Sequence, residues 1–194
     1  MAYTTLALLK VYLGIPATDT DDDALLTVLV GSAQAIVEAY TDRKFEVAAA
    51  TTRYFTIGKD THGPTLLFDA DCIAITSVTN GDGTVITAAQ YITMPRNEFP
   101  WFGIKVLRSS DVIWQYTAQS DPEDAIVVVG KFAYSLTAPA DIVHITQRVA
   151  AYLYRQRDNV ADLDRPIIVG NTTILPGQLP SDIRMLLEPY RRLV

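Results

Sequence analysis

Apolar residues recur every three or four positions between residues 21 and 45, and this spacing predicts one helix of about five turns. Its apolar face is expected to hold Leu25, Leu29, Ala33, Ile36 and Tyr40, with Leu26, Val30 and Val37 beside it. A second strip of the same helix carries small residues, which are Gly31, Ala35 and Ala39. A helix that is apolar or small around most of its circumference must be covered on several sides. We therefore expect it at the centre of a bundle or shared with a neighbouring subunit, and these three small residues are the subunit-packing candidates.

Acidic residues mark the start of this helix. Residues 21–23 are all aspartates, which complement the positive end of the helix dipole and can cap free backbone N–H groups. Counted from Asp19, the cluster superficially suggests an EF-hand loop, but the turn position is Ala24 and the twelfth position is Val30, where that loop needs Gly and Glu. We interpret the cluster as helix capping.

Three further segments have helical patterns. A first helix is expected from Thr4 or Thr5 to Leu13, where Gly14 and Pro16 provide stop signals. Because only a short loop separates it from the long helix, the two should pack as a hairpin. The other two helices are expected from residue 139 to about 155 and from residue 181 to about 192.

The middle of the chain alternates between apolar and polar positions, which is typical of strands. Strands are expected at residues 53–57, 65–68, 73–79, 84–87, 103–108, 112–117 and 125–132. The Asn-Gly-Asp-Gly stretch at 80–83 is a strong hairpin signal, because Asn and Gly tolerate a positive φ. A smaller hairpin is expected around Gly170 and Asn171, between residues 167–169 and 173–175.

These elements predict an α+β chain that is mainly an α-helical bundle, built from an N-terminal helix pair and C-terminal helices, with an inserted antiparallel β module. Residues 1–46 and 138–194 should form the bundle and residues 51–136 the module. No linker or internal repeat separates independent domains, so residues 1–194 are expected to form a single domain.

Composition narrows the class of protein. The chain has 194 residues, of which 49% are hydrophobic and 20% charged, as in soluble globular proteins. No secretory signal is recognised and no apolar run approaches the length of a bilayer crossing, so we expect synthesis in the host cytoplasm and no membrane partner. The formal net charge of −6 argues against a protein that grips phosphate backbones, although it leaves room for DNA that slides past.

Residues for catalysis or metal binding are sparse. There is no phosphate-binding loop, and His62, His144 and the single Cys72 make no credible zinc site. Cys72 is expected to be a buried apolar side chain. Asp69 and Asp71 share one face of a possible strand, but solvated turn carboxylates explain them better than a catalytic pair. The sequence therefore predicts no enzyme, no catalytic residue, no metal and no cofactor.

An aromatic cluster is the remaining candidate for binding. Phe99, Trp101 and Phe102 follow Pro95 in a stretch expected to be a loop between strands. If it is exposed, the cluster is a partner-binding tip, since contiguous apolar surface usually marks an interface. If it is buried, it fills the β module, and both interpretations remain open at this point.

In their order along the chain, four segments resemble the head-tail connector (adaptor) proteins of tailed bacteriophages, the gp6-like or gp15-like family. The first segment is LLKVYLGI at residues 8–15 with DDALL at 22–26, and the second is IVEAYTDRKF at 36–45. The third is PADI at 139–142 with YLYR at 152–155, and the fourth is LP at 179–180 through LLEPYRR at 186–192. Each of these is a helix-packing pattern, so their order carries the resemblance.

The resemblance implies a structural protein of the virion. It would form a ring, commonly of twelve subunits, beneath the portal protein at the phage neck. There it would link the DNA-filled capsid to a stopper or tail-completion protein and line the DNA channel. It could stay monomeric until it meets the portal, because ordering mobile segments costs free energy that only the partner interface offsets.

The resemblance also implies roles for residues. The portal-docking candidates are Leu186, Leu187, Tyr190, Arg191 and Arg192, although this helix could instead only close its own bundle. Arg148 and Arg155 are the DNA-channel candidates, with a solvated helix face as the alternative.

Two other classes of protein are weighed against the connector. One is a different phage neck or tail protein, such as a head-completion or tail-terminator protein, which the strong terminal helices disfavour. The other is a small hydrolase or nuclease, for which the sequence shows no nucleophile or metal cluster.

Overall fold

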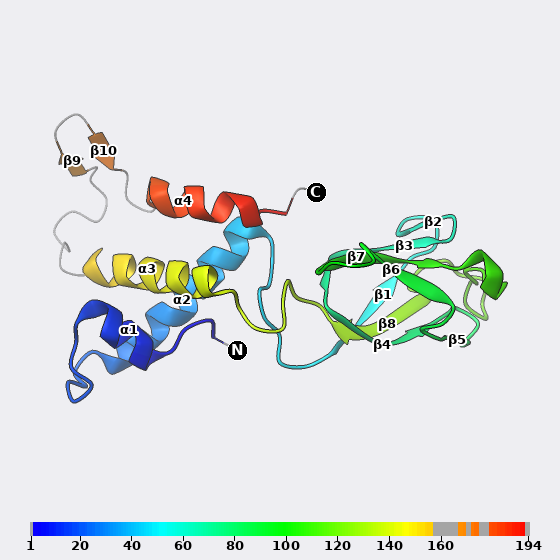
Figure 1. The fold of residues 1–194 in the computed structure, drawn as a ribbon, viewed down its shortest axis with the longest axis horizontal. Helices are drawn as coiled ribbons and strands as arrows, with labels where there is room; N and C mark the ends of the chain where they lie inside the picture. The colour runs from blue at the N-terminus through cyan, green and yellow to red at the C-terminus, as the bar shows by residue number, and fades with distance from the viewer. Residues whose placement is uncertain (1, 157–166, 170–171, 175–178, 193–194) are drawn as a thin grey trace. The chain divides into compact units, whose positions relative to one another are not determined.

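The computed structural model describes residues 2–156, 167–169, 172–174 and 179–192 (Figure 1). Within it the chain divides into two compact units. Residues 43–137 form a β unit, and residues 2–42 with the described part of 138–194 form a helical unit.

The helical unit contains four α-helices among the described residues. They are α1 (Leu6–Leu13), α2 (Asp23–Thr41), α3 (Ala140–Gln156) and α4 (Ser181–Leu187), and α4 continues into the 3-10 turn η3 (Glu188–Tyr190). The Thr5 side chain caps α1 by accepting a hydrogen bond from the Leu8 amide. Gly14 ends α1 at a φ of 75°, which only glycine adopts without strain. α2 packs against α3, and α1 packs against both.

The buried face of α2 is displaced from the predicted one. Its fully or nearly fully buried residues are Leu26, Val30, Ala33, Val37 and Thr41, whereas Leu25 and Leu29 are half-buried. Thr41 reaches the core because its hydroxyl donates to the Val37 carbonyl at 2.8 Å, which satisfies it inside the helix. The buried stripe is therefore narrower than the apolar surface of the helix.

The expectation that no apolar segment approaches the length of a bilayer crossing is wrong for α2. By length and composition alone, this helix is long and apolar enough to cross a bilayer, and 28% of its apolar window is buried in the structure. A core helix of a soluble protein passes the same test, so the finding is weak evidence for a membrane. It does establish that much of an apolar helix lies on the surface of this unit.

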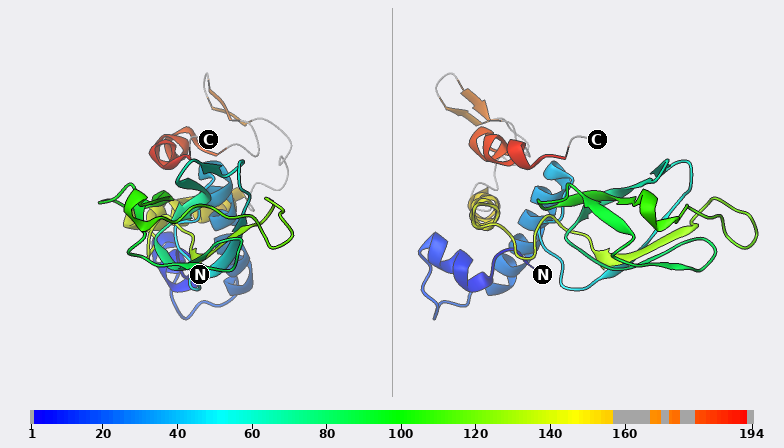
Figure 2. Two further views of the ribbon diagram at one scale, coloured as in Figure 1. Left: turned by 90° about the vertical axis from the view of Figure 1, so that its right-hand side faces the viewer. Right: turned by 45° about the vertical axis from the view of Figure 1, so that its right-hand side comes forward.

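The β unit consists of two antiparallel four-stranded sheets that lie face to face as layers (Figures 1 and 2). One sheet has the order β1 (Thr51–Phe55), β8 (Ile126–Lys131), β4 (Ala74–Thr79), β5 (Val85–Ile86). The other has the order β2 (Thr61–His62), β3 (Thr65–Cys72), β7 (Trp101–Val106), β6 (Tyr91–Met94). Side chains from both sheets fill the space between them, among them Phe55, Leu66, Phe68, Ile104 and Ile126.

The prediction of a mainly α-helical bundle is wrong. In the described residues the fold is α+β, with two four-stranded antiparallel sheets beside four α-helices of which two have only 7 and 8 residues. The reason is that the β strands bury their apolar faces against each other, so they build a core of their own. Helical periodicity located the helices correctly but gave no measure of how much of the core is β.

Two local predictions have opposite outcomes. The hairpin at residues 80–83 is confirmed, since the Asn80 amide donates to the Thr84 carbonyl at 2.8 Å and Gly83 has a φ of 83°. The strand expected at residues 112–117 is wrong, because this segment is irregular and its backbone bonds to the Asn80 side chain. β6 and β2 were not predicted.

The small C-terminal hairpin is also confirmed in its paired strands. β9 (Ile167–Val169) and β10 (Thr172–Ile174) pair antiparallel, with Thr172 opposite Val169. Gly170, Asn171 and Leu175, which belonged to the same prediction, lie outside the described residues.

Candidate functional site

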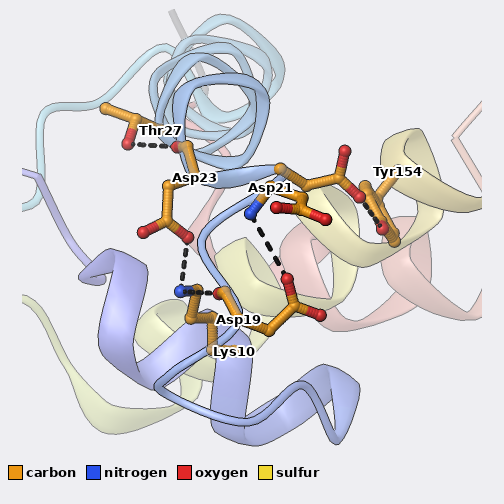
Figure 3. A network of polar contacts seen from close by, with 7 residues as sticks. Lys10, Asp19, Asp21, Asp23, Thr27 and Tyr154 are labelled. Carbon is orange, nitrogen blue, oxygen red and sulfur yellow. Dashed lines mark hydrogen bonds and ion pairs between the residues drawn. The ribbon is translucent and has the colours of Figure 1, made fainter.

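The acidic cluster at the start of α2 is a structural network rather than a cap or an ion site (Figure 3). The Lys10 ammonium, which is buried, pairs with the Asp23 carboxylate and donates to the Asp19 carbonyl at 2.6 Å. The Tyr154 hydroxyl of α3 donates to Asp22 at 2.5 Å. Asp22 makes no side-chain cap bond, so the capping prediction is wrong for this residue.

This network joins three helices. The spacing of residues in the sequence did not predict which of these side chains would meet. Lys10 comes from α1, Asp23 from α2 and Tyr154 from α3 (Figure 3). A buried ammonium is costly unless a carboxylate compensates it, and Asp23 supplies that carboxylate. In the described part of the chain, no group of three or more His, Cys, Asp or Glu residues could hold a metal ion.

α1 buries a charged side chain and leaves apolar side chains exposed. It buries Lys10 and exposes Leu8, Val11 and Tyr12, whose exposed fractions are 48%, 78% and 38%. Tyr12 contacts the His144 ring of α3 edge-on, at 5.8 Å between centroids. The sequence did not identify these apolar residues as exposed, because the pattern of α1 shows two apolar sides and does not indicate which one is covered.

The small-residue strip of α2 is uncovered in this structure. Gly31, Ala35 and Ala39 are all exposed, as are Ala24 and Val28 in line with them, and Val28 is 64% exposed. A Cβ added at Gly31 would meet no atom within 4 Å. The role of Gly31, Ala35 and Ala39 in subunit packing stays a prediction, for which the structure supplies the accessible surface.

The docking candidates of the C-terminal segment fall into two groups, one that contacts the rest of the helical unit and one that is exposed. Leu187 is fully buried, and the Tyr190 hydroxyl donates to Asp141 of α3. The Arg192 amide donates to the Thr41 carbonyl at 2.9 Å, which holds the end of the chain to α2. These contacts close the helical unit itself.

The second group faces outward. Leu186 is 46% exposed, and Arg191 is exposed beside Glu188, whose carboxylate lies 3.7 Å from it. Met185, which the sequence did not single out, is 75% exposed. Docking through Leu186 and Arg191 remains a prediction, and Met185 belongs with them by its exposure.

Polar contacts also hold the start of α4 and the end of α2. The Tyr40 hydroxyl donates to Glu188 at 2.9 Å, and this hydrogen bond raises the pKa of Tyr40. Arg148 of α3 pairs with Asp182 of α4. Burial acts to raise the pKa of Asp182, but the hydrogen bond and charge of Arg148 outweigh it and lower that pKa.

The two DNA-channel candidates have different surroundings. Arg148 is engaged with Asp182, so its charge is largely compensated. Arg155, near the end of α3, is exposed, and no carboxylate lies within ion-pair distance of it among the described residues. Their contact with DNA stays a prediction.

The aromatic cluster of the β unit is partly exposed and partly buried. The prediction that it lies in a loop holds for Phe99 but is wrong for Trp101 and Phe102, which begin β7. Trp101 is half-buried and packs against the core of the unit, whereas Phe99 and Phe102 are 64% and 49% exposed. The Phe99 and Trp101 rings lie 4.9 Å apart between centroids. Trp101 thus helps to fill the β module, whereas Phe99 and Phe102 are exposed as a partner-binding surface would be. The binding of a partner by this cluster remains a prediction.

The residues once considered for catalysis have structural roles. Asp69 pairs with Arg53 and Asp71 with Arg43, each at 2.5 Å. Cys72 is buried, and burial raises the pKa of its thiol to about 11. A thiol with so high a pKa stays protonated near neutral pH and is a poor nucleophile.

Solved structures share this fold. A chain in the "Neck of empty GTA particle computed with C6 symmetry" aligns with a TM-score of 0.59 and 16% identity over 99% of this chain and 91% of that one. A chain in the "Virion of native gene transfer agent (GTA) particle" aligns with a TM-score of 0.61 and 15% identity, with the same coverages. No protein-family model matches the sequence, and no curated protein matches it. At these identities the likeness establishes the fold.

Proposed function

We propose that this protein is a structural component of the neck of a phage-like virion, where it acts as a head-tail connector. The observation that carries the proposal is a shared fold over 99% of the chain with a protein in the neck of a gene transfer agent particle. The connector resemblance of the sequence points the same way. The chains that share the fold belong to the neck and virion of such particles, which fits a structural role.

The proposed connector forms a ring of identical subunits, and a cyclic ring needs two different complementary surfaces on each subunit. The exposed strip of α2 and the exposed face of α1 supply apolar area for such contacts. Twelve subunits remain the expectation from the family resemblance. Small residues such as Gly31, Ala35 and Ala39 would let a neighbouring backbone approach closely.

The remaining roles follow from the same assignment. The outward residues of the C-terminal segment, Met185, Leu186 and Arg191, would contact the portal protein. Arg155 would face the DNA without reading its sequence. A stopper or tail-completion protein would bind the opposite side of the ring.

The test is the mass of the protein in solution, alone and with the purified portal of the same particle, by light scattering behind a sizing column. A ring, or a monomer that becomes a ring on the portal, is the expected result. Gly31→Leu adds bulk to the α2 strip where nothing within 4 Å opposes it, so the monomer should fold and the ring should be lost. Ala118→Leu adds bulk at an exposed loop of the β unit and serves as the control.

One result would contradict the connector role itself, and another would contradict only the interface assigned to α2. A monomer that ignores the portal would remove the connector role. A ring that forms equally well with Gly31→Leu would leave the connector role standing but exclude the α2 strip from its interface.

A further inference from the structure

β6 is an edge strand, and no strand of the described residues pairs with its outer side. It is the last strand in the order β2-β3-β7-β6, so β7 covers only one of its two edges (Figure 1). An uncovered edge offers a row of backbone N–H and C=O groups to another chain. β6 is four residues long, and each of its side chains is half-buried.

The register identifies which backbone groups are free. Tyr91 lies opposite Val106, and the Leu107 amide donates to the Gln90 carbonyl at 2.8 Å. Hydrogen-bonded and non-hydrogen-bonded pairs alternate along an antiparallel ladder. Ile92 and Met94 therefore bond to β7, and the peptide groups of Tyr91 and Thr93 point to the free edge.

A cavity of about 370 Å³ lies beside this edge. Its lining includes Tyr91 and Thr93 of β6, Trp101 of β7, Ile75 of β4 and Arg96. The lining thus brings β4 of one sheet together with β6 and β7 of the other. The volume is within the range of pockets that hold small ligands or single side chains.

The cavity combines an aromatic wall with one unpaired charge. Trp101 packs against the core on one side and carries the exposed Phe99 ring at 4.9 Å. Arg96 is exposed, and no carboxylate pairs with it in the described ranges. The complementary ligand would carry an apolar group and a carboxylate.

We propose that the outer edge of β6 takes an extended peptide segment of a partner protein as an added strand. The segment bonds through its backbone to Tyr91 and Thr93, inserts one apolar side chain against Trp101 and sets an Asp or Glu near Arg96. In this mode of recognition, backbone hydrogen bonds give affinity and the side-chain pocket gives specificity. The proposal concerns the β unit alone and does not depend on the neck assignment.

The free edge provides a selective variant. In Thr93→Pro the lost N–H is one that points outward, so the ladder with β7 stays intact, and Pro is tolerated on edge strands in this orientation. Thr93→Ala removes the side chain but keeps the N–H, so the difference between the two variants isolates the backbone bond. Arg96→Glu tests the charge, with Arg108→Glu as its control at another exposed arginine for which the described part of the chain shows no ion pair.

The experiment uses the full ¹⁵N-labelled chain and capped heptapeptides. The peptides have Leu, Phe, Met or Val at the centre and either Asp or Lys two positions later. At least one Asp peptide is expected to bind and to slow hydrogen exchange of the Tyr91 and Thr93 amides. Thr93→Pro should weaken this binding at least tenfold, while Arg96→Glu should reverse the preference for Asp over Lys, and Arg108→Glu should not. The amide spectrum of Thr93→Pro should otherwise match that of the parent.

Three results would overturn the proposal. One is that no peptide of the panel binds at millimolar concentration. Another is binding that protects neither amide or is unchanged in Thr93→Pro. The third is protection of these two amides in the protein alone as its concentration rises, which would make a second copy of the chain the occupant.

Discussion

Asn80 determines the course of a whole loop. Its side chain is 5% exposed, and its Nδ2 donates to the Ile113 carbonyl at 2.8 Å. Its Oδ1 accepts from the Gln115 amide at 2.9 Å and from the Gly81 amide at 3.1 Å. The apolar alternation of residues 112–117 predicted a strand, but the Asn80 side chain pairs with two of the backbone groups of this segment, the Ile113 carbonyl and the Gln115 amide. Such a long-range side-chain bond leaves no mark in local sequence periodicity.

Asn80→Ala should therefore destabilise the protein by roughly 1–2 kcal/mol, because it removes three part-buried hydrogen bonds to the backbone of Gly81, Ile113 and Gln115. Urea unfolding monitored by tryptophan fluorescence would measure the loss, and Trp114 lies in the affected loop. Asn80→Asp keeps the acceptor oxygen but loses the donor to the Ile113 carbonyl. Its free energy of unfolding should therefore lie between those of Asn80→Ala and the parent. Equal stability of Asn80→Ala and the parent would mean that the loop is held by other contacts.

At the scale of elements, helices were predicted better than strands. α2 and α3 are long enough for their periodicity to fix both their type and their approximate ends. β2 has two residues and β6 has four, which is too short for alternation to be recognised, whereas the equally short β5 was predicted because it follows the hairpin signal at residues 80–83. Which apolar side of a helix is covered also stayed undetermined, since that depends on buried partners such as Asp23 beside Lys10.

α2 allows the stability of the unit to be separated from its contacts. Gly31 lies inside the helix, with helical geometry and open space where a Cβ would be. Gly31→Ala should raise the free energy of unfolding by about 0.5–1 kcal/mol, since Gly costs the helix that much relative to Ala. Thermal unfolding of the dilute protein measures it. A decrease in stability would indicate that the α2 surface is already covered in solution.

At the scale of the molecule, each unit has its own core. Residues 43–137 contain the whole apolar cluster between the two sheets. Of the candidate surfaces, the sequence located the small-residue strip and the aromatic cluster. It gave Leu186, Leu187, Tyr190, Arg191 and Arg192 as one group, because exposure is a property of the packed unit and sequence alone does not separate Leu187 from Leu186. The free edge of β6 follows from strand order, which no local pattern specifies.

Residues 43–137 are expected to fold when produced alone. Their two ends are already joined, since the Tyr134 amide donates to the Lys44 carbonyl at 2.7 Å and the Ser135 hydroxyl donates to the Phe45 carbonyl at 2.9 Å. Cooperative thermal unfolding and a dispersed amide spectrum would be the evidence. Arg43→Ala in the same fragment should be less stable, because it leaves the buried Asp71 carboxylate unpaired. A fragment without cooperative unfolding would contradict the expectation.

The joined ends of the β unit have a consequence for how such a protein can evolve. A segment that enters and leaves its host at one point can be lost, replaced or acquired in a single genetic exchange, because the flanking chain then has only a short gap to close. The helices and the β unit can thus follow separate histories. A relative with the same helices and a different module between residues 42 and 138 would be the trace of such an exchange.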